Sequence, residues 1–159
     1  MKILLTGANG YIGMRLLPLL LDAGHEVICA VRDEIRLSVS KTVRKKIDVI
    51  EVDFLEKPRS GLLPSNIDAA YYLIHSMSSS TDDFDEKEAI AARHFNTYMA
   101  QTQCQQVIYV GGIANEENLS KHLWSRKNVE STLSEGTAAL TVLRAGIIVG
   151  SGSSSFEII

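Results

Sequence analysis

Short apolar runs alternate with longer amphipathic segments along most of the chain. The apolar runs have the length of buried strands, whereas the longer segments repeat apolar residues at the helical spacing of three and four. This pattern predicts strands over residues 2–6, 26–32, 47–52, 69–74, 107–110 and 140–143. It predicts helices over residues 11–23, 84–102 and 118–133, and leaves the polar segment 33–46 open between a loop and a short helix.

Regular alternation of strands and helices is typical of an α/β fold with a parallel sheet. We therefore predict a Rossmann fold, a doubly wound parallel sheet with helices on both faces. Right-handed crossovers on both sides of the first strand give the strand order 3-2-1-4-5-6. The apolar spacing also predicts which helical side chains are buried: Ile12, Leu16, Leu19 and Leu20 in the first helix, and Ile90, Phe95 and Met99 in the second.

The most informative motif is TGANGYIG at residues 6–13, which joins the first strand to the first helix. Gly7 can adopt backbone angles closed to other residues, Gly10 leaves room for a pyrophosphate, and Gly13 allows the helix to lie close to the strand. We interpret the loop as a dinucleotide-binding site; the alternative is a glycine-rich loop with no ligand. The predicted cofactor-binding residues of this loop are Gly7, Asn9, Gly10, Tyr11, Ile12 and Gly13.

Two strand ends carry charged residues that bear on the choice of cofactor. Arg32 follows the second strand, where an acidic side chain would bind the ribose hydroxyls of NAD and an arginine would bind the 2′-phosphate of NADP. We expect NADP to be preferred over NAD, although the neighbouring Asp33 offers a carboxylate to the ribose. Asp53, after the third strand, is placed to accept a hydrogen bond from adenine; the alternative is a loop carboxylate that opens a turn.

Two further strand ends are predicted to lie near the nicotinamide. The fourth strand ends in Leu73, Ile74 and His75, and His75 is either a pocket residue or a structural histidine. The fifth strand is followed by Gly111 and Gly112. Two successive glycines indicate a close approach of the backbone to the ligand, or a sharp exit turn.

Composition narrows the class of protein. At 159 residues the chain has the length of one domain, and 45% apolar with 22% charged residues is ordinary for a globular protein. A net charge of −3 gives no support to a nucleic-acid or membrane-surface role. No apolar run approaches the roughly 20 residues of a membrane span, and no room is left for a signal peptide. We read one basic cluster as a solvated helix face except for its first member: Arg32, Arg36, Lys41, Arg44, Lys45 and Lys46.

The cysteines indicate the compartment. Cys29 falls in a predicted buried strand and Cys104 at a predicted helix end. Two cysteines are too few for a disulfide framework, so we expect reduced thiols in a cytoplasmic protein.

Several motifs together resemble the short-chain dehydrogenase/reductase superfamily, in the extended and atypical branches that include sugar-nucleotide epimerases and NmrA-like proteins. TGANGYIG is similar to T-G-x-x-G-x-x-G, and VIYVGG is similar to the superfamily's fifth strand. Residues 68–76 resemble a fourth strand that ends in histidine. HLWSRKNVE at residues 122–130 resembles Y-x-x-S-K-x-x-x-E, and LRAGIIVGSG at residues 143–152 resembles the segment after strand six.

The resemblance implies catalysis by a tyrosine, a lysine that lowers the tyrosine pKa, and a hydroxyl residue after the fifth strand. Here the tyrosine position is His122 and the lysine position is Arg126, and residues 111–114 carry no hydroxyl. His122 can exchange a proton near neutral pH, which makes it the candidate acid or base. Arg126 stays protonated, so its candidate role is to anchor ribose, phosphate or substrate. No metal site is expected.

These observations predict an NAD(P)(H)-binding domain of an oxidoreductase or epimerase-like enzyme acting on an unidentified small molecule, compatible with a homo-oligomer. The rival is a non-catalytic NADP(H)-sensing or assembly protein of the NmrA-like type, which the loss of the tyrosine, lysine and hydroxyl favours. A flavin- or sugar-nucleotide-binding module is a third alternative. Residues 1–150 are expected to form the dinucleotide-binding domain, and residues 151–159 to begin a substrate-domain segment of a longer protein.

Overall fold

Six parallel strands form one sheet in the order β3-β2-β1-β4-β5-β6. The computed structural model describes residues 1–75, 84–113 and 121–151. The strands are β1 (Lys2–Thr6), β2 (Glu26–Val31), β3 (Ile47–Glu51), β4 (Ala69–Tyr72), β5 (Gln106–Gly112) and β6 (Ala139–Ala145). The predicted Rossmann topology is therefore confirmed.

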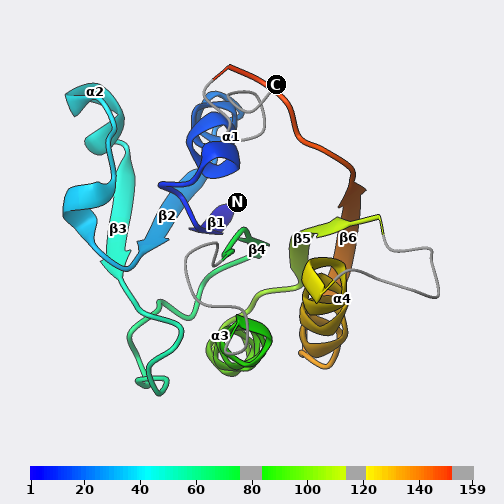
Figure 1. Cartoon of the computed structure of the whole chain (residues 1–159). Helices are drawn as coiled ribbons and strands as arrows, with labels where there is room; N and C mark the ends of the chain where they lie inside the picture. The colour runs from blue at the N-terminus through cyan, green and yellow to red at the C-terminus, as the bar shows by residue number, and fades with distance from the viewer. Residues whose placement is uncertain (76–83, 114–120, 152–159) are drawn as a thin grey trace.

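The helices cover both faces of this sheet. They are α1 (Tyr11–Asp22), the short 3-10 helix η1 (Glu34–Arg36), α2 (Lys41–Arg44), α3 (Phe84–Met99) and α4 (Lys121–Ser134). In Figure 1, α3 and α4 lie on one face and α1 lies on the other. The polar segment left open by the sequence contains η1 and α2. No helix in the described parts of the chain is long and apolar enough to cross a membrane.

Each face of the sheet has its own apolar core. Tyr72, Phe95 and Met99 belong to the core beneath α3 and α4, and the core beneath α1 contains Leu5 and Leu17. The prediction that Phe95 and Met99 are buried is confirmed, whereas Ile90 is only partly buried. Both cysteines are free and buried, although Cys104 lies in the connection after α3 and not at the helix end.

The predicted buried stripe of α1 is wrong at one position. Leu20 is buried as predicted, but Leu19 is 64% exposed, and the buried positions of the helix are Gly13, Leu17 and Leu20. These three positions are four and three residues apart, which also satisfies helical periodicity. The position of Gly13 excludes the stripe that contains Leu19, because Gly13 packs against the backbone of the preceding loop.

The glycine loop is fitted closely between β4 and α1. Gly7 has a φ of +62°, and a Cβ built on it would lie 2.6 Å from the Leu73 carbonyl oxygen. A Cβ on Gly13 would lie 2.8 Å from the Cα of Ala8 and would also meet the Gly7 carbonyl oxygen. The loop, the first turn of α1 and the end of β4 are therefore in direct backbone contact.

Gly13→Ala should lower the free energy of unfolding by about 1 to 3 kcal/mol, because the new methyl group overlaps backbone atoms that have no room to move. Urea denaturation measures the loss. Gly146→Ala is the matched control, since a Cβ there would meet only Ile113 Cδ1 at an ordinary 3.9 Å. Equal stability of the two variants would contradict the close packing of α1 on the loop.

Candidate functional site

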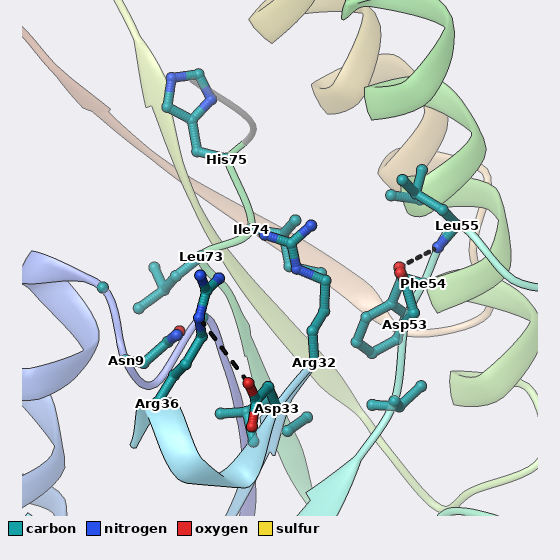
Figure 2. Close-up of a pocket in the computed structure, with 16 residues that line it drawn as sticks. Asn9, Arg32, Asp33, Arg36, Asp53, Phe54, Leu55, Leu73, Ile74 and His75 are labelled. Carbon is teal, nitrogen blue, oxygen red and sulfur yellow. Dashed lines mark hydrogen bonds and ion pairs between the residues drawn. The ribbon is translucent and has the colours of Figure 1, made fainter. Parts of the chain in front are cut away.

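A cavity opens where β1, β2, β3 and β4 end (Figure 2). Four segments form most of its wall: the glycine loop and the residues that follow β2, β3 and β4. Parallel strands present their carboxyl ends at one edge of the sheet, and ligands bind there beside the switch in strand order. The polar and apolar residues of these segments that line the cavity are Gly7, Asn9, Gly10, Arg32, Asp33, Arg36, Asp53, Phe54, Leu55, Leu73, Ile74 and His75.

Eight of the predicted cofactor-binding residues line this cavity: Gly7, Asn9, Gly10, Arg32, Asp53, Leu73, Ile74 and His75. Tyr11, Ile12 and Gly13 do not, because α1 turns away from the cavity after Gly10. The Tyr11 ring packs instead under the Arg15 guanidinium, 3.8 Å from the ring centroid, and its hydroxyl lies against Gly150. Arg15 also donates a hydrogen bond to the Ser151 carbonyl, which holds the segment after β6 on α1.

Three charged residues of the cavity wall follow β2: Arg32, Asp33 and Arg36. Asp33 accepts a hydrogen bond from the Ile35 amide at 2.9 Å and lies 3.9 Å from Arg36 Nε. Arg36 is solvent-exposed on η1, as predicted, and it also lines the cavity together with Arg32. Figure 2 shows the two guanidinium groups on the same side of the site.

The segment after β3 is held against α3. Asp53 Oδ1 accepts a hydrogen bond from the Leu55 amide at 2.9 Å, so this carboxylate does open a turn while it lines the cavity. Phe54 is buried, and its carbonyl accepts a hydrogen bond from His94 Nδ1 at 2.8 Å. The Phe54 ring packs edge-on against Tyr98. Sequence reasoning missed Phe54 and Leu55, although an apolar pair after a turn-forming aspartate is the signal of such a wall.

His75 is held by a buried carboxylate. Its Nδ1 lies 2.8 Å from Glu88 Oε1, and the Ser125 hydroxyl donates to Glu88 Oε2 at 2.7 Å. Glu88 is only 5% exposed and Ser125 is fully buried. Sequence reasoning missed Glu88, which lies three, four and seven residues before the buried Ala91, Ala92 and Phe95 of α3. A charged residue in register with a buried stripe is the signal that could have revealed it.

The two glycines at the end of β5 are packed closely against side chains of neighbouring elements. Gly111 and Gly112 continue the strand and pair with β6, so neither forms an exit turn. A Cβ on Gly112 would lie 2.8 Å from Leu123 Cδ2 and 3.4 Å from Arg126 Cδ. Gly111 is approached instead by the side chains of Val142 and Tyr109, and neither glycine lines the cavity.

Arg126 is tied to the same strand end. Its Nη1 donates to the Val110 carbonyl at 2.8 Å, and its own carbonyl accepts a hydrogen bond from the Tyr109 hydroxyl at 3.3 Å. Arg126 does not line the cavity. The side chain of His122 lies outside the described residues.

Burial removes several other groups from proton chemistry near neutral pH. It raises the pKa of Cys29 to about 11, against the lowering effect of Arg44, and it also raises the pKa of Cys104. Burial raises the pKa of Tyr109 to about 12 as well. Within the described ranges no group of three or more His, Cys, Asp or Glu side chains is arranged to hold a metal ion.

The glycine-loop end of the cavity suits an anion. Gly10 caps α1 without a side-chain hydrogen bond, and the first turn of the helix has no acidic residue. Its amide groups therefore present partial positive charge to an anion beside Gly7 and Gly10, where no side chain intervenes.

Comparison with protein-family models assigns the chain to a family. Residues 7–151 match the model of the NAD(P)H-binding domain. The chain belongs to this family. The model spans the glycine loop, all the strand ends that line the cavity, and the segment that packs on α1. No curated protein matches the sequence at a significant level.

Solved structures with the same fold include several nucleotide-dependent enzymes. A Bacillus halodurans protein assigned as an NAD-dependent epimerase/dehydratase superposes with a TM-score of 0.77 at 21% identity, covering 97% of this chain and 74% of that one. UDP-glucuronic acid 4-epimerase from Bacillus cereus, in complex with NAD, gives 0.74 at 18% identity over 92% and 57%. The terminal R domain of the myxalamid biosynthetic pathway gives 0.70 at 19% identity over 91% and 48%. The chain thus spans about half the length of the last two proteins.

The Glu88 network should contribute to stability. Ser125→Ala removes a buried donor from a carboxylate oxygen, and we expect the free energy of unfolding to fall by about 1 to 3 kcal/mol. Thermal and urea denaturation measure it. Ser134→Ala is the control, because that hydroxyl bonds to the Ser131 carbonyl on the exposed end of the same helix; a loss no greater than the control's would argue against the buried bond.

Proposed function

We propose that this NAD(P)H-binding domain prefers NADP(H) to NAD(H) and serves an oxidoreductase or epimerase-like reaction on a small molecule. The observation that carries the cofactor preference is the pair of arginines, Arg32 and Arg36, in the cavity wall after β2. A guanidinium pairs bidentately with a phosphate, and two of them favour a doubly charged 2′-phosphate over a neutral hydroxyl.

The contacts of the Asp33 carboxylate also favour NADP(H) over NAD(H). Asp33 is the residue that would bind the ribose hydroxyls of NAD, but its Oδ1 accepts the Ile35 amide and its Oδ2 faces Arg36. Rotation toward a ribose would break the cap of η1. The proposed preference for NADP(H) is argued from this chain's own residues. The similar UDP-glucuronic acid 4-epimerase is described in complex with NAD, so the preference is not taken from it.

The proposed type of reaction follows from the resemblance of the segment at residues 122–130. His122 and Arg126 remain the candidate acid or base and the candidate anchor by resemblance, and Arg126 is occupied by the Val110 carbonyl. A non-catalytic NADP(H)-sensing role is favoured by the replaced tyrosine and lysine. Incubation with NADPH and a panel of carbonyl and sugar-nucleotide compounds separates the two: oxidation of NADPH with product formation supports the enzyme, and tight binding without turnover across the panel supports the sensor.

Arg32→Ala should reduce the preference for NADPH over NADH by about 1 to 3 kcal/mol, the value of a charge-assisted hydrogen bond. Arg36→Ala should also reduce it, by a smaller amount because this guanidinium shares Asp33. Calorimetric titration with both cofactors measures the preference. Lys46→Ala is a control outside the cavity wall, and equal affinity of the parent protein for the two cofactors would refute the preference.

Gly10→Val should abolish dinucleotide binding while leaving the fold in place. Its φ of −81° is open to any residue, and a Cβ would meet only the Gly7 carbonyl oxygen, at 3.2 Å. The branched side chain would instead fill the path of the pyrophosphate. Fluorescence titration with NADPH measures binding and circular dichroism checks the fold; unchanged affinity would place the ligand elsewhere.

A further inference from the structure

We propose that Tyr11 and Arg15 are positioning residues that hold the segment after β6 across the strand ends, and that this segment slows the release of a bound dinucleotide. The segment comprises residues 147–151 and is called the strap below. The inference rests on the proposed binding of NADP(H). It concerns two residues of α1 that do not line the cavity themselves.

The strap crosses the edge of the sheet at which the cavity opens. β6 ends at Ala145, and Ser151 contacts α1, which follows the end of β1. Because β5 and β4 separate β6 from β1 in the sheet, the chain crosses three strand spacings, about 14 Å in all. The stretch from Ala145 to Ser151 reaches at most about 20 Å, which allows no detour. The strap therefore passes the ends of β5 and β4 on its way to α1 (Figure 1).

The sequence favours an extended strap that is held at its far end. Ile147, Ile148 and Val149 are branched at Cβ, which restricts their side chains and favours extended backbone. All three are exposed, and Ile147 is 79% exposed. Side chains in this position gain little from burial, so the attachment of the strap depends on the contacts that Gly150 and Ser151 make with α1.

Those contacts involve one face of the first turns of α1. Tyr11 and Arg15 are four residues apart, so their side chains are neighbours on the helix surface. Arg15 Cζ lies 3.8 Å from the centroid of the Tyr11 ring, and the same guanidinium donates a hydrogen bond to the Ser151 carbonyl oxygen. The Tyr11 hydroxyl lies against Gly150, where a Cβ would collide with it. The strap is thus bound to the arginine and packed against the ring that the arginine covers.

This attachment lies next to the glycine-loop end of the cavity. Tyr11 directly follows Gly10, which lines the cavity and caps α1. A pyrophosphate bound there joins two nucleosides that extend to opposite sides. With the 2′-phosphate of one nucleoside at Arg32 and Arg36, on the β2 side of β1, the other extends toward β4 and β5. The strap crosses the ends of these two strands, so it covers the second half of the ligand.

A strap that covers a bound ligand has a kinetic signature. Loss of its contacts with α1 should speed dissociation of the ligand and should not slow association. A direct contact of Arg15 with a phosphate would act differently, because removal of an attracting charge slows the encounter. A purely structural role of Arg15 would lower the stability of the fold and leave both rate constants unchanged.

Stopped-flow fluorescence with NADPH separates these cases. Arg15→Gln should raise the dissociation rate constant about 3- to 10-fold, the effect of losing one exposed cation–π contact and one hydrogen bond. The association rate constant should be no lower than that of the parent. Lys46→Gln is the matched control, since it removes the same charge from an exposed position outside the cavity wall. Circular dichroism confirms that both variants fold.

A second pair of variants tests the strap without changing any charge. Gly150→Ala should also speed dissociation, because its methyl group meets the Tyr11 hydroxyl. The same substitution in a Tyr11→Phe background should have no further effect, since the next ring atom, Cζ, lies at an ordinary 3.4 Å. Gly146→Ala is the control: it adds a methyl group just before the strap, where Ile113 Cδ1 at 3.9 Å is the nearest described atom.

The outcomes separate the strap from the proposed function. An unchanged dissociation rate or a slower association in Arg15→Gln overturns the role of the strap. An equal effect of Gly150→Ala in both backgrounds overturns it as well. Either result leaves cofactor binding itself intact, whereas a parent protein that binds no NADPH refutes the proposed function and the strap with it.

Discussion

The rest of the structure depends on the close backbone contact between the glycine loop, the end of β4 and the start of α1. Gly7 lies against the Leu73 carbonyl, and Gly13 lies against the loop that precedes it. This contact sets the position of the α1 amides, the face of α1 that meets the sheet, and the direction in which residues 73–75 leave β4. The glycine-loop end and the His75 end of the cavity are therefore fixed by the same few atoms.

Around that contact, charge is divided between two ends of one cavity. The end of β2 carries Arg32 and Arg36, which suit an anion, whereas the end of β4 carries a histidine bound to a buried carboxylate. The α3 helix supports the segments after β3 and β4, since His94 holds the Phe54 carbonyl and Glu88 holds His75. A rigid helix that supports both the wall after β3 and the ring after β4 keeps their separation constant.

The sequence predicted the fold well because the strand order follows from the alternation of elements and from the handedness of crossovers. Side-chain placement was harder. Two stripes of α1 satisfied the same periodicity, and only the overlap at Gly13 excludes the one that contains Leu19. Glu88 was missed because a charged residue in a helix resembles a solvated one until its partners are known, whereas Arg36 is solvated as predicted and lines the cavity as well. Gly111 and Gly112 were predicted from a true feature, a close approach, but the approaching atoms are side chains of β5 and β6 at Gly111 and of α4 at Gly112.

A contribution to stability does not by itself explain the buried Glu88. An apolar residue of similar volume in place of a buried ionic group is often neutral or stabilising, so stability alone does not explain why α3 carries a carboxylate in its apolar stripe. If Glu88 served only to join α3 to α4, the hydrogen bond from the Ser125 hydroxyl to one carboxylate oxygen would suffice. The second oxygen instead fixes a histidine that lines the cavity. Glu88 thus joins the scaffold of α3 and α4 to the end of β4, and it fixes the orientation of a residue in the cavity wall.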